Sequence, residues 1–347
     1  MQSTKSHIDE QSMITPALVA RLGRGAQEVI DEVKLREKRA QLALVLELAR
    51  QRFERHADTS ETVARLAADL HDLRISSGAG VWKHLIPVAQ AHPVSQFLLQ
   101  DPFTKWSFEK PRGYSGDAGL LDIIYKHPAA AEVVAAASSL GSEIFAYTVE
   151  ATTSVAARER REILAKEVDA ASAHAEKAEV LAVACGYLRE AELSESFQSG
   201  RLGRWVALDQ DAESVDVVAR ANPGTSILPM VGNVSGLMRR SYDLGTFDLV
   251  YASGLYDYLP YAVAVRLTQR LIEMLKPGGA YLFANYSQEI RTDGYMETFM
   301  DWPLLLRSEA DMWQIVNAAV DRNRVDVDVF YGENRNIVYT RIRRKSA

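Results

Sequence analysis

Val180-Leu-Ala-Val-Ala-Cys-Gly-Tyr-Leu-Arg-Glu190 joins an apolar run to a glycine turn, and this stretch decides the fold. The apolar run ends in Cys185-Gly186, and Leu188–Phe197 has the pattern of a helix. A strand, a glycine turn and a helix open a βαβ unit, in which the turn and the helix N-terminus face a bound ligand. Because the stretch lacks the three glycines of a dinucleotide fingerprint, it predicts a ligand site without naming the ligand.

The chain after residue 179 alternates between strands and helices, which predicts a mainly parallel sheet with helices on both faces. At the end, 325–331 and 336–342 each alternate at period two around a turn at Gly332, so we expect a C-terminal antiparallel hairpin. The expected strands are Val180–Ala184, Trp205–Leu208, Ser226–Val231, Phe247–Ala252 and Tyr281–Ala284. The expected helices are Leu188–Phe197, Ala212–Ala221, Val234–Arg240 and Tyr261–Leu275.

The chain before the sheet reads as all-α, so we predict a helical domain over 1–150 and a sheet domain over 151–347. The expected helices are Pro16–His56, Ser60–Leu73, Val81–Leu99 (interrupted at His92-Pro93), Ala118–Tyr125, Pro128–Ser139 and Ser142–Ala175. Residues 101–117 hold two Pro, two Gly and four aromatic side chains, which is typical of a binding loop. The alternative is an aromatic loop packed across the domain junction.

Composition indicates a globular protein of 347 residues, 47% hydrophobic and 25% charged, with a net charge of −6. This charge gives no general reason to expect nucleic acid or an anionic membrane as a partner. One cysteine excludes an internal disulfide and fits a reducing compartment. The sequence has no apolar run of about 18 residues and no signal-peptide core, so we expect a cytoplasmic protein. The helical domain is a candidate homodimer surface.

Polar and small residues follow each predicted strand, and the carboxyl ends of parallel strands are where such sheets bind ligands. Asp209 lies where a carboxylate would grip a ribose diol, and Asn233 where an amide would meet an adenine edge. The candidate cofactor-binding residues are Ala184, Cys185, Gly186, Asp209, Gln210, Asn233, Val234, Ser253 and Gly254.

Each of these candidates has an ordinary structural alternative. Asp209 would cap the next helix, although Asp211 is better placed to do so. Asn233 would serve a turn, and Gly254 and Tyr256 would be loop and core residues. Cys185 is better explained as a small residue in a tight turn than as a nucleophile, because the sequence shows no dedicated base for it.

This set of strand ends resembles the class I S-adenosylmethionine-dependent methyltransferases over about 179–343. The resemblance rests on the glycine turn, Asp209, Asn233, the Leu275-Lys-Pro-Gly-Gly279 turn and the terminal hairpin. It implies a Rossmann-like methyltransferase sheet and S-adenosyl-L-methionine as the cofactor. The chain departs from the family at Ala182, where the usual residue is acidic, and at Ala184, where it is glycine.

A narrower resemblance is to bacterial methyltransferases that make 3-hydroxypalmitic acid methyl ester, an extracellular signalling factor. It is carried by five short motifs, which are 110–117, Val183-Ala-Cys-Gly186, Leu208-Asp-Gln-Asp211, 251–259 (Tyr-Ala-Ser-Gly-Leu-Tyr-Asp-Tyr-Leu), and Phe299-Met-Asp-Trp302 with Arg307. This resemblance implies O-methylation of a carboxyl group.

The mechanism expected from the residues fits that reaction. A carboxylate is ionised at neutral pH and needs no base, and none of the seven histidines follows a predicted strand, since the last of them, His174, precedes the first strand. A base would otherwise be Asp117 or Asp257, or His84 or His92 of the helical domain. The candidate catalytic residues are Tyr114, Asp117, Tyr258 and Arg307, with Tyr256, Asn285, Tyr286 and Trp302 for the substrate and Arg112 for the cofactor's carboxylate. No metal site is predicted.

Other reactions and other classes of protein stay open on the sequence. Methylation of N, C or a phenolic O of a small metabolite is the second interpretation. An NAD-dependent oxidoreductase and a non-catalytic cofactor-binding protein are the competing classes.

Overall fold

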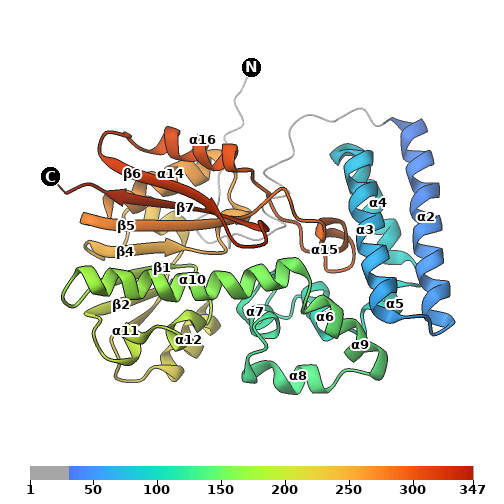
Figure 1. Ribbon diagram of the computed structural model, residues 1–347, viewed down its shortest axis with the longest axis horizontal. Coiled ribbons are helices and arrows are strands. Elements are labelled where there is room, and N and C mark those ends of the chain that lie inside the picture. Colours follow the sequence, from blue (N-terminus) through green and yellow to red (C-terminus); the bar gives the residue numbers. More distant parts are fainter. Residues whose placement is uncertain (1–30, 347) are drawn as a thin grey trace. The chain divides into compact units, whose positions relative to one another are not determined.

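The computed structural model describes residues 31–346, which belong to two compact units whose elements are labelled in Figure 1. The helical unit comprises 31–157 together with Ile290–Pro303, and the sheet unit comprises Arg158–Glu289 and 304–346. Helix α10 (Thr152–His174) runs across the division between the units. The sequence had placed this division at residue 150 and had not separated 290–303 from the sheet domain.

Helix ends in the helical unit follow from capping residues. The Asp58 carboxylate accepts from the N–H of Glu61 at the start of α3, and Gly78 (φ +75°) separates α3 from α4. The predicted helices over Ser60–Leu73 and Val81–Leu99 are confirmed, with the break at His92-Pro93; the first part of the helix expected from Pro16 lies outside the described residues. The helices are α2 (Glu32–Glu54), α3 (Thr59–Ser77), α4 (Ala79–Ala91), α5 (Ser95–Leu98), α6 (Pro102–Glu109), α7 (Ala118–Ile124), η1 (Pro128–Ala130), α8 (Ala131–Ala135), α9 (Ser139–Thr148) and α15 (Asp293–Thr298).

Three predictions in this part of the chain are wrong. The helix expected over Pro128–Ser139 is the 3₁₀ turn η1 followed by the short helix α8, which ends at Ala135. The first half of the expected 101–117 loop is helix α6, because the Asp101 carboxylate accepts from the N–H groups of Phe103 and Thr104 and Pro102 occupies the first helical position. Only 110–117 is irregular. The single helix expected over Ser142–Ala175 is two helices, α9 and α10, with the chain turning at 149–151.

The sheet unit holds a seven-stranded sheet in the order β3-β2-β1-β4-β5-β7-β6. The first five strands in sequence are parallel, whereas β7 is antiparallel to both β5 and β6. The predicted fold class, a mainly parallel α/β sheet with a C-terminal antiparallel hairpin after a helical region, is confirmed. The strands are β1 (Glu179–Val183), β2 (Arg204–Asp209), β3 (Ile227–Val231), β4 (Phe247–Ala252), β5 (Leu275–Tyr286), β6 (Val325–Tyr331) and β7 (Ile337–Arg344).

Strand β5 is longer than expected because it includes the Lys276–Gly279 turn as an irregular start. Its pairing with β4 shifts register between Phe247 and Leu249. A Cβ on Gly279 would lie 2.9 Å from the backbone oxygen of Phe247, so this close approach requires glycine.

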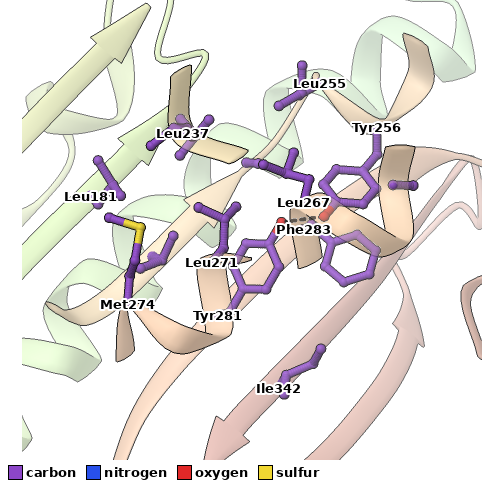
Figure 2. Packing of buried hydrophobic residues seen from close by; sticks show 14 of the residues in the cluster. Leu181, Leu237, Leu255, Tyr256, Leu267, Leu271, Met274, Tyr281, Phe283 and Ile342 are labelled. Atoms are coloured by element: carbon purple, nitrogen blue, oxygen red, sulfur yellow. Dashed lines mark hydrogen bonds between the residues drawn. The ribbon is translucent and has the colours of Figure 1, made fainter. Parts of the chain in front are cut away.

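Helices cover both faces of the sheet (Figure 1). One face packs against α13 (Val234–Met238), α14 (Tyr261–Glu273) and α16 (Glu309–Ala319), and Figure 2 shows Leu237, Leu267 and Leu271 among the sheet residues of this core. The other face carries α10, α11 (Glu195–Gln198) and α12 (Ala212–Ala221), where Phe197 meets Trp205 edge to face. Burial of these apolar stripes stabilises the sheet unit and leaves one end of the sheet for polar residues.

The connection from β1 to β2 corrects another prediction. No regular helix spans Leu188–Phe197: a 3₁₀ turn, η2 (Arg189–Glu192), precedes the short helix α11. The reason is local, because Leu188 has a left-handed backbone (φ +54°) and the Ser194 side chain caps α11. A ligand at the β1 turn therefore does not face a helix N-terminus.

Candidate functional site

The carboxyl ends of the parallel strands are tied together by hydrogen bonds. The N–H of Cys185 donates to the backbone oxygen of Leu208 (3.2 Å), and the N–H of Gly232 donates to that of Asp209 (2.8 Å). These bonds join the turns after β1, β2 and β3 at one end of the sheet. This is the end at which open α/β sheets bind ligands.

The turn after β1 holds left-handed backbone at Ala184 (φ +55°), Gly186 (φ +54°) and Leu188. Glycine adopts such a conformation without cost, whereas alanine does not, so Ala184 occupies a position suited to glycine. Burial raises the pKa of the Cys185 thiol well above its ordinary value, and the carboxylates of Asp209 and Glu190 raise it further. The thiol therefore suits a tight turn rather than a nucleophile, and contact of this turn with a cofactor stays a prediction.

Asp209 is 7% exposed, and its carboxylate is held by the backbone on both sides. Oδ2 accepts from the N–H of Gly186 (2.8 Å) and Oδ1 from that of Asp211 (2.9 Å). Burial raises the pKa of Asp209, and these N–H groups oppose that rise. Each carboxylate oxygen can accept more than one bond, so the group can also receive ribose hydroxyls.

Helix capping after β2 and β3 is also settled. Asp211, not Asp209, caps α12, since its side chain accepts from the N–H of Glu213. Gln210 is half-buried beside it. The Asn233 side-chain oxygen accepts from the N–H of Gly236 (2.8 Å) and so caps α13, in which Val234 is the first residue. A contact of Asn233 with adenine would use its amide nitrogen and stays a prediction, as do those of Gln210 and Val234.

After β4, Ser253 and Gly254 are half-buried and lie against Arg160 of α10. The Arg160 guanidinium donates to the Ser253 backbone oxygen (2.9 Å), and a Cβ on Gly254 would lie 3.9 Å from both of its terminal nitrogens. Arg160 is 3% exposed and lies over the ring of Tyr286, 5.7 Å from its centre. Arg160 was not among the predicted site residues.

Tyr256, expected to contact substrate, is a core residue. It is fully buried, its hydroxyl is 2.6 Å from that of Thr268, and it accepts from the Tyr281 hydroxyl (2.8 Å; Figure 2). Its ring stacks on Phe283 with centroids 4.2 Å apart. The geometry therefore supports the alternative interpretation of the sequence, in which Tyr256 is a core residue. Tyr258, two residues on, is half-buried in η3 (Tyr256–Tyr258).

Asn285 and Arg307 fix the backbone at the ends of β4 and β5. The Arg307 guanidinium donates to the backbone oxygens of Tyr256 and Leu259 and to the Asn285 side-chain oxygen. The Asn285 amide donates to the backbone oxygens of Tyr286 and Leu305. Both side chains are buried, so this geometry supports a positioning role; their direct contact with substrate stays a prediction.

Asp257 is buried next to these groups. Its Oδ1 accepts from the N–H of Tyr286 (2.7 Å), which joins the loop after β4 to the end of β5. Burial raises the pKa of Asp257 to about 6, against the lowering effects of Arg160, the Tyr286 N–H and Arg307. A carboxyl group with such a pKa can accept a proton at neutral pH.

Glu190 is a further buried acid, which the sequence did not single out although it ends the opening stretch. Its carboxylate accepts from the Tyr251 hydroxyl (2.5 Å), and burial raises its pKa while Tyr251, Arg160 and Arg161 lower it. Tyr251 is the register partner of Ala182 across β1 and β4. The only sequence signal for Glu190 was an acidic residue four positions after Gly186. Arg160 had no such signal, because α10 carries many charges.

The remaining predicted residues, Arg112, Tyr114, Asp117 and Trp302, belong to the helical unit. Asp117 caps α7 and accepts from the Trp106 indole N–H (3.1 Å), and burial raises its pKa. Arg112 and Tyr114 are half-buried and Trp302 is buried. Their roles in binding or catalysis stay predictions.

Two kinds of feature are absent from the described residues. Within 31–346 no group of three or more His, Cys, Asp or Glu side chains is arranged to hold a metal ion. No helix in the same residues has the length and apolar character to cross a membrane.

Comparison with known proteins bears on the fold. No family model and no curated protein matches the sequence. A crystal structure of a possible exported protein from Bordetella parapertussis is similar over 92% of this chain and 100% of its own, with a TM-score of 0.52 and 18% identity. An identity this low supports the shared fold alone.

Two methyltransferase structures are more distant. The N-methyltransferase NodS from Bradyrhizobium japonicum, in complex with S-adenosyl-L-homocysteine, has 14% identity and a TM-score of 0.39, over 56% of this chain and 89% of its own. Magnesium protoporphyrin IX methyltransferase from Synechocystis, with bound cofactor, has 12% identity and a TM-score of 0.38, over 56% and 84%. TM-scores this low assign no substrate and no site residue to this chain.

Proposed function

We propose that this protein is an S-adenosyl-L-methionine-dependent methyltransferase that acts on a small molecule. The observation that carries the proposal is the Asp209 carboxylate, which is bonded to the Gly186 N–H where β1 and β2 end. It lies in a parallel sheet that ends in an antiparallel hairpin, a strand order that NAD-binding sheets usually lack. The same end of the sheet carries the buried acids Glu190 and Asp257, which suit a ligand with a net positive charge.

The residues present fit this cofactor. Asp209 would hold the ribose diol, and Asn233 with Val234 would border the adenine. Ser253 and Gly254 would lie along the chain that links the ribose to the amino-acid group. When bound, the cofactor supplies an electrophilic methyl group on a sulfonium; the protein's residues orient the acceptor and keep water out.

We favour O-methylation of a carboxylic acid as the reaction. A carboxylate acceptor is already ionised, so the protein needs to position it and not to deprotonate it. The bacterial 3-hydroxypalmitic acid methyl ester group, which the sequence resembles, makes a product of this kind. Methylation of an amine or a phenol is the second candidate, and the raised pKa of buried Asp257 favours it because that carboxyl group could serve as the base.

Two measurements test the proposal. Calorimetry on the full chain should show binding of S-adenosylhomocysteine and none of NADH; the reverse result would assign the protein to the oxidoreductases. Transfer of a radiolabelled methyl group to a panel of carboxylic acids, amines and phenols then identifies the acceptor. A methyl ester releases methanol in mild alkali, whereas methyl amines and aryl ethers do not.

Cofactor binding without transfer to any acceptor would favour a non-catalytic binding protein. Cytoplasmic location, a homodimer formed through the helical unit, and the absence of a nucleic-acid partner stay predictions.

A further inference from the structure

Arg160 is a buried cation at the end of the sheet where the cofactor is proposed to bind. It comes from α10, which precedes the sheet in sequence, and its guanidinium donates to the Ser253 backbone oxygen directly after β4. Its charge lowers the pKa values of Asp257 and Glu190, both of which burial raises, so it acts within electrostatic reach of both acids. A guanidinium that is 3% exposed costs free energy unless charged partners accompany it.

Glu190 offers the opposite charge at the neighbouring strand end. Tyr251 donates its hydroxyl to this carboxylate, and Tyr251 pairs with Ala182 in the sheet. Ala182 is the position at which the family that the sequence resembles usually has an acid. The Tyr251 hydroxyl therefore holds the Glu190 carboxylate near a strand position that has no charge of its own.

We propose that Arg160 and Glu190 recognise the amino-acid end of the cofactor, Arg160 binding its carboxylate and Glu190 its ammonium group. The inference rests on the proposed function. An arginine of the sheet unit thereby takes the place of Arg112, which the sequence had suggested for the carboxylate. Opposite charges set at the ends of β1 and β4 form a site for a zwitterion, since a guanidinium matches a carboxylate and a carboxylate matches an ammonium.

This assignment accounts for the altered glycine turn. With Ala184 in place of glycine, a Cβ is present at a left-handed position of the turn (φ +55°), and a methyl group there would limit how closely a ligand could approach the backbone. Side chains from α10 and η2 would then supply contacts that the turn does not.

The test compares ligands that differ only at this end. Calorimetry on the full chain measures the dissociation constants of S-adenosylhomocysteine, its decarboxylated analogue, its deaminated analogue and 5′-methylthioadenosine, which lacks the amino-acid group. For the wild type, S-adenosylhomocysteine should bind about 10- to 100-fold more tightly than either single analogue. Arg160→Gln should remove the preference over the decarboxylated analogue and leave 5′-methylthioadenosine binding within about threefold.

Glu190→Gln should act on the other half of the ligand and abolish the preference over the deaminated analogue. Arg160→Lys, which keeps the charge, should retain part of the carboxylate preference even if Arg160→Gln does not fold. Arg220→Gln, the same change at an exposed position of α12, is the matched control and should leave all four affinities unchanged.

The outcomes separate the inference from the function on which it rests. If the wild type binds S-adenosylhomocysteine and 5′-methylthioadenosine equally, or if Arg160→Gln keeps the carboxylate preference, the inference is overturned and the proposed function stands. If the wild type binds none of the four ligands, the proposed function itself fails.

Discussion

Replacing Asp209 by asparagine tests the proposed ribose contact most directly. The carboxylate has two oxygens, and each already accepts one backbone N–H, from Gly186 (2.8 Å) and from Asp211 (2.9 Å). Asparagine keeps one acceptor and turns an NH₂ group toward the other N–H, so one of these bonds is lost. A ribose hydroxyl that had faced the missing oxygen loses its acceptor as well.

The size of the effect follows from those bonds. A hydrogen bond to a charged group contributes about 1.5–3 kcal/mol, so the dissociation constant of S-adenosylhomocysteine should rise about 10- to 150-fold in Asp209→Asn. Asp209→Ala removes both acceptors and should raise it about 10²- to 10⁴-fold. Each buried N–H left without a partner lowers the free energy of unfolding by about 1–3 kcal/mol.

Calorimetry gives the affinity, and urea unfolding gives the stability of the same variants. Asp216→Asn, an exposed change on α12, is the control for the loss of one negative charge. If Asp209→Asn lowers stability as expected but leaves S-adenosylhomocysteine binding within about threefold of the wild type, then the Asp209 carboxylate stabilises the turns after β1 and β2 and does not contact the ligand. The ribose assignment would then be wrong.

Three other predictions concern stability. Burial raises the pKa of Asp101 from 3.8 to about 6, so between these pH values the folded protein keeps a proton that the unfolded chain releases. The free energy of unfolding should therefore fall by about 3 kcal/mol as the pH rises from 3.8 to 6. Urea titrations at several pH values measure this dependence, and Asp101→Asn should make the free energy of unfolding less dependent on pH. Ala184→Gly should raise the free energy of unfolding by about 0.5–1 kcal/mol by relieving its left-handed backbone, and a loss of stability would contradict this. Tyr256→Phe should lower the free energy of unfolding by about 1–2 kcal/mol, because the hydroxyls of Thr268 and Tyr281 lose a buried hydrogen-bond partner, and the KM for substrate should not change. A raised KM without a loss of stability would instead show that Tyr256 contacts the substrate.

Local patterns in the sequence predicted the sheet unit well. Strands β4 and β6 and helix α12 have the predicted bounds, and the hairpin lies where the period-two alternation placed it. These elements were predictable because apolar residues on the buried face of a helix or strand recur at the period of that element, about 3.6 or 2 residues. This pattern can be read from a short stretch of sequence. The failures came where turn chemistry competed with periodicity. The left-handed backbone of Leu188 lies where the helix after β1 was expected to begin, and Asp101 starts a helix that was not expected.

The residues of the candidate site were likewise predictable only where a local sequence pattern marks them. Asp209 was predictable because it directly follows an apolar strand, and a strand's carboxyl end is marked in the sequence. Arg160 was not, since nothing in a charged helix indicates which of its arginines is buried at the ends of other strands. Tyr256 shows the converse: it follows β4 as a binding residue would, yet its hydroxyl bonds to α14 and β5 in the core.

The sequence by itself determined the order of strands and helices, the capping of most helices, and which strand ends carry polar groups. All of these depend on residues within a few positions of one another. Only the tertiary structure decided that 290–303 belongs to the helical unit, that Asn285 and Arg307 fix the backbone, and that Arg160 and Glu190 are buried at the ends of β4 and β1. Those outcomes depend on contacts between distant segments, and the free energy of burying a charge or a hydroxyl is set by the partners that the fold brings to it.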